Sequence, residues 1–203
     1  NNISSRTCFF NKLHIVLVNF KLRHICVFSI KKHMKSKGNI VFLGMMGSGK
    51  TSIGKLFSQK HKLKFYDTDR LIENAMGMKI SKIFEYKGEI FFRNFEEKIT
   101  LNILQKKKSV ISLGGGSFLN KKVQKEIRNN HTSFWLYWDN RTIIDRIKKS
   151  HKRPLAIKST IDDLNDLIKK RSNIYSKAMY KINCNGLSKK EIVNKVFETY
   201  ETN

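Results

Sequence analysis

The chain has few acidic residues, few cysteines and almost no proline. Only 16 of its 203 residues are Asp or Glu, against 41 Lys and Arg, and it has one proline and three cysteines. Cys8, Cys26 and Cys184 are odd in number, widely separated and without metal-ligand spacing. This pattern argues against a cysteine-based metal site and indicates free thiols in a reducing compartment.

No apolar run is suited to spanning a membrane. Leu13 to Ile30 is the most apolar stretch, but polar and charged residues such as Lys21 and Arg23 interrupt it. No secretory signal, with a clean apolar core and a small-residue cleavage site, is visible. Internal repeats, heptads and long linkers are also missing. We therefore expect a cytoplasmic protein that acts as a monomer and does not contact a membrane.

The net charge of +25 raises the question of nucleic-acid binding. Of the 41 basic residues 32 are Lys and nine are Arg, and the lysines are scattered over most of the expected elements. Lysine, asparagine and isoleucine are abundant, which is typical of an AT-rich coding sequence. We interpret the charge as a solvated surface that attracts anionic substrates, and expect no nucleic-acid partner.

Residues 1–33 differ from the rest of the chain, with six basic residues and no acidic ones. The first methionine is Met34, five residues before the first convincing strand. The segment is expected to be disordered, and either translated in frame upstream of the working protein or an organelle transit peptide. We favour the first interpretation, with residues 34–203 as one complete domain. An organelle would replace the cytoplasm if the second holds.

Residues Gly44–Thr51 form a complete Gly-x-x-x-x-Gly-Lys-Thr phosphate loop. The apolar run 40–43 precedes it and a helical pattern follows it, as this motif requires. Its glycines let backbone N–H groups surround phosphate oxygens at a helix N-terminus. Lys50 can reach the β- and γ-phosphates, and the Thr51 hydroxyl can bind Mg²⁺. The sequence therefore predicts binding of ATP or GTP.

Apolar strand patterns alternate with helical patterns from residue 39 onward. This alternation predicts an α/β fold with a parallel sheet covered by helices on both faces, and with ligands beyond the carboxyl ends of the strands. The expected strands are 39–43, 64–66, 109–113, 132–137 and 180–184. The expected helices are 50–61, 70–76, 80–86, 89–105, 121–129, 141–149, 161–179 and 189–199.

Two carboxylates, Asp67 and Asp69, follow the second expected strand. One can hold Mg²⁺ directly or through water, and the other can orient or deprotonate an acceptor hydroxyl. Asp69 is also placed to be the N-cap of the following helix, and both interpretations can hold at once.

A run of three glycines, Gly114–Gly116, ends the third expected strand. Three consecutive glycines let a ligand approach the backbone closely, which a plain turn does not require. Upstream, Arg93 and Glu96 are three residues apart, so Glu96 can hold the guanidinium for planar recognition of an anion. Phe84 and Phe92 are expected in the core.

The basic loop 150–160 contains the only proline, Pro154. Arg153 in this loop can close over a nucleotide and meet the developing phosphoryl charge. A solvated loop and an exposed Arg171 in the next expected helix are the plain alternatives.

Taken together, these segments resemble shikimate kinase from about Met34 to the C-terminus. The matching pieces are Gly44–Thr51, Asp67-Thr68-Asp69 with Ile72-Glu73, Phe92-Arg93 with Glu96-Glu97, Leu113–Gly116, Arg153-Pro154-Leu155, and Arg171 with Tyr175. The set is specific in combination, although no single member is. The resemblance implies a three-layer sandwich of the P-loop NTPase type, whose five-stranded parallel sheet has the order 2-3-1-4-5.

The resemblance also implies roles for these residues. Lys50, Asp69 and Arg153 would be catalytic, and Thr51 and Asp67 would serve Mg²⁺. The residues implied for the co-substrate ATP are Gly47, Ser48, Gly49, Lys50, Thr51, Ser52, Arg146 and Arg153. Those implied for shikimate are Asp69, Phe84, Phe92, Arg93, Gly115, Gly116 and Arg171, with the two arginines on the carboxylate.

We therefore expect ATP-dependent phosphorylation of the 3-hydroxyl of shikimate, a step toward chorismate and the aromatic amino acids. Another phosphate-loop kinase, such as a gluconate kinase, is the nearest alternative. A non-catalytic nucleic-acid-binding protein on the same fold is an alternative of a different class, supported by the charge of +25.

Overall fold

Five short strands form one fully parallel sheet, in which β1 and β3 are buried at every position. Strands covered on both faces read as continuous apolar runs, which explains the sequence of β1. The strand order is β2-β3-β1-β4-β5, which confirms the expected fold class and order. The strands are β1 (Ile40–Leu43), β2 (Lys64–Asp67), β3 (Ser109–Ser112), β4 (Thr132–Tyr137) and β5 (Tyr180–Asn183).

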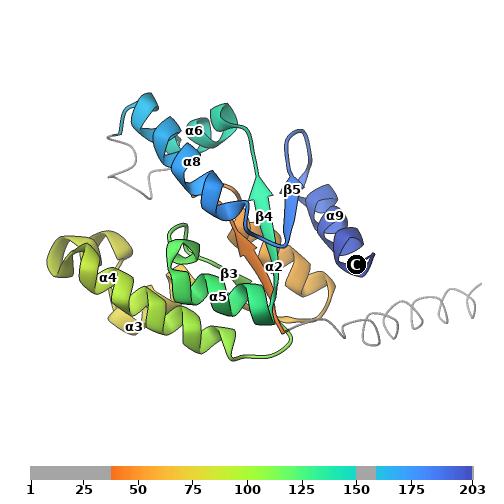
Figure 1. Ribbon diagram of the computed structural model, residues 1–203, viewed down its shortest axis with the longest axis horizontal. Helices are drawn as coiled ribbons and strands as arrows, with labels where there is room; N and C mark the ends of the chain where they lie inside the picture. The colour runs from red at the N-terminus through yellow and green to blue at the C-terminus, as the bar shows by residue number, and fades with distance from the viewer. Residues whose placement is uncertain (1–37, 150–158, 203) are drawn as a thin grey trace, which may run out of the picture. The chain divides into compact units, whose positions relative to one another are not determined.

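Helices cover both faces of this sheet. In Figure 1, α5 and α8 lie on one side of β4 and β5, and α2 and α9 lie on the other. The helices are α2 (Lys50–Lys60), α3 (Thr68–Met76), α4 (Ile80–Leu104), α5 (Lys121–Asn130), α6 (Asn140–Lys148), α8 (Ile161–Tyr175) and α9 (Lys189–Glu201), with a 3₁₀ turn η1 (Ser117–Leu119). The carboxyl ends of the parallel strands meet at one edge, where the phosphate loop follows β1.

The computed structural model describes residues 38–149 and 159–202. The expected extension, Met34, Cys8, Cys26 and the loop segment with Arg153 lie outside these ranges. The remaining cysteine, Cys184, is a buried free thiol whose pKa burial raises to about 12. Within the described ranges, no helix combines the length and apolar character that crossing a bilayer requires.

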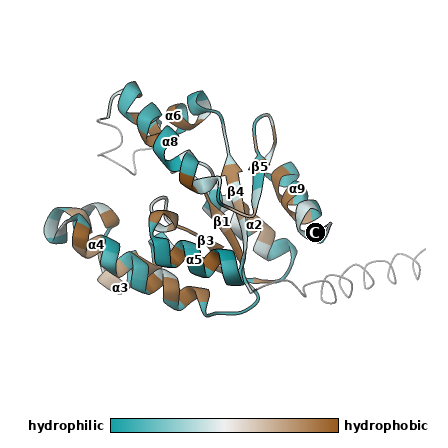
Figure 2. Cartoon of the chain, in the orientation of Figure 1, coloured by the Kyte–Doolittle hydropathy of each residue, from teal (hydrophilic) through white to brown (hydrophobic). Residues whose placement is uncertain are grey.

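Apolar side chains fill the space between the sheet and its helices. Phe42 of β1 packs against Phe57 of α2 and Phe134 of β4, with ring centroids 6.0 Å apart in each pair. Figure 2 shows a largely hydrophobic β4 beside a more hydrophilic β5, and helices in which hydrophobic and hydrophilic residues alternate. A second, smaller cluster around Ile72, Ile83 and Phe92 joins α3 to α4. This cluster fixes α4, which carries one wall of the site.

Three local expectations change. The helix expected to reach residue 179 ends at Tyr175, because the Met179 N–H donates to the Ser133 hydroxyl (2.9 Å) and the chain turns into β5. The helices expected at 80–86 and 89–105 form one element, but Gly88 interrupts it with φ 76° and ψ 171°. The N-cap of α3 is Asp67, which accepts from the Arg70 N–H, so the N-cap expectation for Asp69 is wrong.

Candidate active site

The phosphate loop is a sharp turn set by left-handed glycines. Gly47 has φ 80° and Gly49 has φ 88°, which L side chains rarely adopt. Gly49 is the N-cap of α2, so the helix begins at Lys50. The positive end of the helix dipole and the loop N–H groups therefore lie together, as an anion site needs.

The ammonium of Lys50 lies against the backbone of this loop. Its Nζ donates to the carbonyl oxygens of Gly44 (2.8 Å) and Met45 (2.9 Å), and the residue is 8% exposed. These bonds hold the charge at the loop, where it can reach the phosphates of a nucleotide.

Thr51 and Asp67 meet beside the loop. The Thr51 hydroxyl donates to Oδ2 of Asp67 over 2.6 Å, and Asp67 is 7% exposed. A hydroxyl and a carboxylate supply the hard oxygen ligands that Mg²⁺ takes together with nucleotide phosphates. The chemistry of the pair therefore fits a magnesium ion.

Asp69 lies against the first of the three glycines. A methyl group built on Gly114 would be 2.6 Å from Oδ1 of Asp69 and 2.7 Å from Oε1 of Glu96. Thr68 ties the two segments together, because its hydroxyl donates to the Ser112 carbonyl (3.3 Å) and accepts from the Gly114 N–H (2.7 Å). Only glycine leaves room for both carboxylates at this point.

The other two glycines face the two arginines. A methyl group on Gly116 would overlap the Arg93 guanidinium, and one on Gly115 would be 3.5 Å from Nη1 of Arg171 and 3.6 Å from the Met46 nitrogen. Tyr175 holds this turn, because its hydroxyl donates to the Gly115 carbonyl over 2.5 Å. The glycine run therefore joins the phosphate loop to the arginine-lined region.

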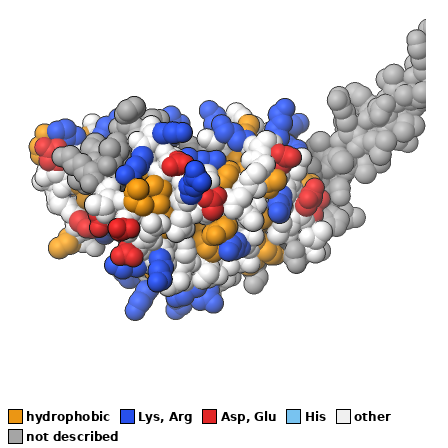
Figure 3. Space-filling view, turned by 90° about the horizontal axis from the view of Figure 1, so that it is seen from above, with side chains coloured by type: hydrophobic (Ala, Val, Ile, Leu, Met, Phe, Trp, Pro, Cys, Tyr) orange, Lys and Arg blue, Asp and Glu red, His pale blue; other side chains and the backbone are white. Residues whose placement is uncertain are grey.

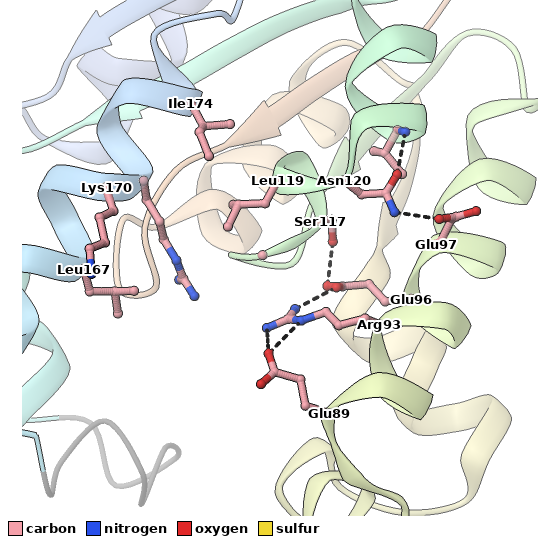
Figure 4. A pocket seen from close by; sticks show the side chains of 13 residues that line it. Glu89, Arg93, Glu96, Glu97, Ser117, Leu119, Asn120, Leu167, Lys170 and Ile174 are labelled. Carbon is pink, nitrogen blue, oxygen red and sulfur yellow. Dashed lines mark hydrogen bonds and ion pairs between the residues drawn. The ribbon is translucent and has the colours of Figure 1, made fainter.

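Two glutamates hold Arg93. Its Nη1 donates to Glu96 over 2.8 Å, and Nε and Nη2 each donate to Glu89 over 3.2 Å. Burial opposes the charge, but Glu96 and then Glu89 outweigh it and raise the pKa of Arg93. Glu96 also accepts from the Ser117 hydroxyl (2.7 Å), so the chain of contacts in Figure 4 runs from α4 to the glycine turn.

Phe84 and Phe92 pack against each other and against the guanidinium of Arg93. Their ring centroids are 4.4 Å apart, and the guanidinium carbon lies 5.7 Å from the Phe84 ring and 5.2 Å from the Phe92 ring. Phe92 is 3% exposed and belongs to the smaller apolar cluster. Both rings therefore help to orient Arg93 through packing and cation–π contact.

A cavity of about 440 Å³ lies between α4 and α8. Arg93 and Gly116 line it from one side, and Lys170 and Arg171 line it from α8. Figure 4 shows Leu167, Lys170 and Ile174 of α8 across from Glu89, Arg93 and Glu96 of α4. The Nε atom of Arg171 is buried without a hydrogen-bond partner among the described residues. The cavity thus offers two guanidinium groups to an anion.

Arg146 of α6 lies against Gly47 of the phosphate loop and does not line the cavity. Its Nη1 donates to the Gly47 carbonyl over 3.5 Å, and its guanidinium carbon lies 3.7 Å from the ring centroid of Trp138. Ser48 is 1% exposed, whereas Gly47, Thr51 and Ser52 are exposed. The described residues that are expected to bind ATP therefore lie in the phosphate loop, at the start of α2 or, for Arg146, in contact with the loop.

Several residues here had no role assigned from the sequence. Glu89 lies four residues before Arg93, a helical spacing that could have revealed it. Thr68, between the two aspartates, and Ser117, after the glycine run, had no signal beyond their place in a motif. Trp138, one of two tryptophans, directly follows a predicted strand, which is a weak signal.

Comparisons with known proteins point to one family. A family model described as shikimate kinase matches residues 46–201. The shikimate kinase of Thermodesulfovibrio yellowstonii is 38% identical over 164 residues, covering 80% of this chain and 95% of that protein. The shikimate kinase of Bartonella henselae is 32% identical over 183 residues, covering 88% of this chain and 87% of that protein.

Solved structures give the same result. Shikimate kinase from Acinetobacter baumannii in complex with shikimate superposes with a TM-score of 0.78 at 27% identity, covering 84% of this chain and 97% of that one. Shikimate kinase from Aquifex aeolicus has a TM-score of 0.73 at 32% identity, covering 80% and 96%. Deoxyadenosine kinase from M. mycoides, at 14% identity and a TM-score of 0.55, shares the fold alone.

Proposed function

The chain belongs to the shikimate kinase family, and we propose that it transfers the γ-phosphoryl group of ATP to the 3-hydroxyl of shikimate. The observation that carries this proposal is the convergence at Gly115. Its Cβ position is 3.5 Å from Arg171 of the cavity wall and 3.6 Å from the Met46 nitrogen of the phosphate loop. If the arginines bind the carboxylate of shikimate, the rest of the shikimate molecule lies beside the phosphates of the nucleotide.

On the nucleotide side, the phosphate loop and Lys50 bind the ATP phosphates. Thr51 and Asp67 would hold Mg²⁺, because a hydroxyl and a carboxylate are the oxygen ligands that this ion prefers. When bound, Mg²⁺ neutralises charge on the β- and γ-phosphates. Gly47, Ser48, Gly49 and Ser52 complete the loop contacts. Arg146, which touches the Gly47 carbonyl, lies on the side of the loop proposed for the adenosine.

On the acceptor side, Arg93 and Arg171 bind the shikimate carboxylate, since guanidinium groups match carboxylates in paired hydrogen bonds. Gly115 and Gly116 face the hydroxyl region of the ring, and Phe84 and Phe92 orient the Arg93 wall. Asp69 accepts the proton of the 3-hydroxyl as this oxygen bonds to the γ-phosphorus and the bond to the ADP oxygen breaks.

Arg153 is proposed to stabilise the charge of the transferring phosphoryl group. This role rests on the Arg153-Pro154-Leu155 match to the family, because the residue lies outside the described ranges. An arginine at that position would act on developing charge together with Lys50.

The protein is proposed to act as a cytoplasmic monomer.

Two other activities remain to be tested against this one. A gluconate kinase would also offer a cation to a carboxylate, but the family model and the relatives that match this chain are shikimate kinases. Nucleic-acid binding would need basic residues gathered in a stripe. On the face in Figure 3, lysine and arginine side chains are interspersed with acidic and hydrophobic ones, which favours the small-molecule substrate.

The test is ADP release by the full chain with ATP and Mg²⁺, measured with shikimate, with gluconate and without an acceptor. Release that depends on shikimate supports the proposal. Release with gluconate alone would keep the nucleotide side and overturn the roles of Arg93 and Arg171. Salt-sensitive RNA binding without any ADP release would favour the nucleic-acid alternative.

A further inference from the structure

Trp138 follows β4 directly and places a buried indole between the phosphate loop and α6. The residue is 9% exposed. Its Nε1–H donates to the Ser48 carbonyl over 3.0 Å, across 90 positions of sequence. A buried hydrogen bond to a loop carbonyl restricts that peptide plane, because its loss would leave the carbonyl unpaired.

The peptide bond transmits this restriction to the next residue. The carbonyl of Ser48 and the N–H of Gly49 belong to one planar trans peptide and point in opposite directions. Holding the carbonyl toward Trp138 therefore directs the Gly49 N–H to the side away from the indole. Gly49 is left-handed, with φ 88°, and the hydrogen bond helps to fix this uncommon conformation.

The same ring supports Arg146. The guanidinium carbon lies 3.7 Å from the Trp138 centroid, within the range of a strong cation–π contact. Arg146 in turn donates to the Gly47 carbonyl (3.5 Å), and a methyl group on Gly47 would be 3.3 Å from its Cβ. Trp138 and Arg146 thus contact each other, and each also bonds one residue of the loop pair 47–48.

We propose that Trp138 is a positioning residue for the nucleotide site, acting through the Ser48 carbonyl and the Arg146 guanidinium. This inference rests on the proposed function, since it names a residue that sets the ATP side of that site. Trp138 does not line the cavity between α4 and α8, so its effect should fall on nucleotide binding and leave shikimate binding unchanged.

Two variants separate the contacts of the ring. Trp138→Phe keeps an aromatic face for Arg146 and removes the N–H donor, whereas Trp138→Leu removes both. We expect the Kd for ADP, measured by calorimetry with Mg²⁺ in the buffer, to rise about 3- to 10-fold in the Phe variant and further in the Leu variant. The KM for ATP should follow, while the KM for shikimate stays within about twofold.

Tyr175→Phe is the matched control, because it removes one hydroxyl from an aromatic side chain on the acceptor side. The Tyr175 hydroxyl donates to the Gly115 carbonyl over 2.5 Å. This variant should alter the KM for shikimate more than the Kd for ADP. If the Trp138 variants lose affinity for ADP and for shikimate equally, and lose thermal stability as well, Trp138 has a general structural role and the proposal is overturned.

A double-mutant cycle tests the route through Arg146. Trp138→Leu and Arg146→Met should raise the Kd for ADP by less in combination than the product of their separate effects, because they break the same contact. Fully independent effects would remove Arg146 from the proposal. An ADP affinity unchanged in Trp138→Leu would refute the proposal altogether, whatever the activity of the protein.

Discussion

The nucleotide side and the acceptor side of this site are built in different ways. The centre of the proposed nucleotide side is eight consecutive residues, Gly44–Thr51, which offer backbone groups and one buried lysine. The acceptor side joins α3, α4, the glycine turn and α8, and it presents charged side chains. Of these, the Arg93 side chain is 38% exposed, whereas its partner Glu96 is 5% exposed.

Because of this difference, one set of residues is expected to determine the affinity for phosphate and another the choice of acceptor. A backbone cradle is fixed by glycine conformations and serves many nucleotides and acceptors equally. On the acceptor side, salt bridges to Glu89 and Glu96 hold Arg93, and the guanidinium groups can be changed one side chain at a time. Loss of Lys50 on the nucleotide side should therefore mainly lower kcat, and changes to the arginines of the acceptor side should mainly raise the KM for shikimate.

The largest effect should come from Lys50, the buried cation of the phosphate loop. Lys50→Met is expected to lower kcat by about 10³-fold or more, because the charge on the transferring phosphate loses its partner. Shikimate binding, measured by calorimetry, should be unchanged. A parallel loss of shikimate binding would break the separation between the two sides.

Asp69→Asn should give the next largest effect. The amide keeps the size of the side chain beside Gly114 but cannot accept the hydroxyl proton, so kcat should fall about 10²- to 10⁴-fold. The Kd for ADP should be that of the wild-type protein. Normal turnover in this variant would remove Asp69 from its assigned role.

The two arginines should show the character of the acceptor side. Arg93→Lys and Arg171→Lys keep the charge but lose paired hydrogen bonding, so each should raise the KM for shikimate about 10- to 100-fold. The KM for ATP serves as the internal control and should change little. An unchanged KM for shikimate in both variants would place its carboxylate elsewhere.

The two glutamates beside Arg93 provide a matched pair. The Glu96 side chain is 5% exposed and that of Glu89 is 66% exposed, although both bond the same guanidinium. Glu96→Gln should cost about 1–3 kcal/mol of unfolding free energy and raise the KM for shikimate several-fold. Glu89→Gln should stay within about 0.5 kcal/mol of the wild type. Chemical denaturation and steady-state kinetics measure both, and equal effects would contradict the buried role of Glu96.

The smallest effect should come from a pair of neighbouring lysines on α8. Lys170 lines the cavity and Lys169 does not. All 16 acidic side chains lie in the described ranges, and none forms an ion pair with Lys170 there. Lys170→Glu should raise the KM for shikimate about 2- to 5-fold at low ionic strength, and less in salt. Lys169→Glu should have no such effect, so equal changes in the two variants would indicate only overall charge.

The sequence predicted the nucleotide side better than the acceptor side for a physical reason. Gly44–Thr51 is contiguous, and each residue type in it has a local role. The sheet order also followed, through the family resemblance. The Asp67 cap was missed because two aspartates flank Thr68, and only the backbone hydrogen bond to Arg70 distinguishes them.

Contacts between distant segments were the hardest to predict. The hydrogen bond from Trp138 to Ser48 and the one from Tyr175 to Gly115 join elements through tertiary packing, which no local periodicity records. The premature end of α8 has the same origin, since Ser133 of β4 captures the Met179 N–H. Arg93 was predicted because arginine is scarce in the chain and Glu96 has helical spacing from it.

The most direct test of the account is the structure of the product. The full chain would be incubated with ATP, Mg²⁺ and shikimate, and the product analysed by phosphorus and proton magnetic resonance. We expect one phosphate monoester, with its phosphorus coupled to the proton on carbon 3, in equal amount to ADP. Phosphate on another hydroxyl, or inorganic phosphate alone, would contradict the meeting of the two sides at Asp69.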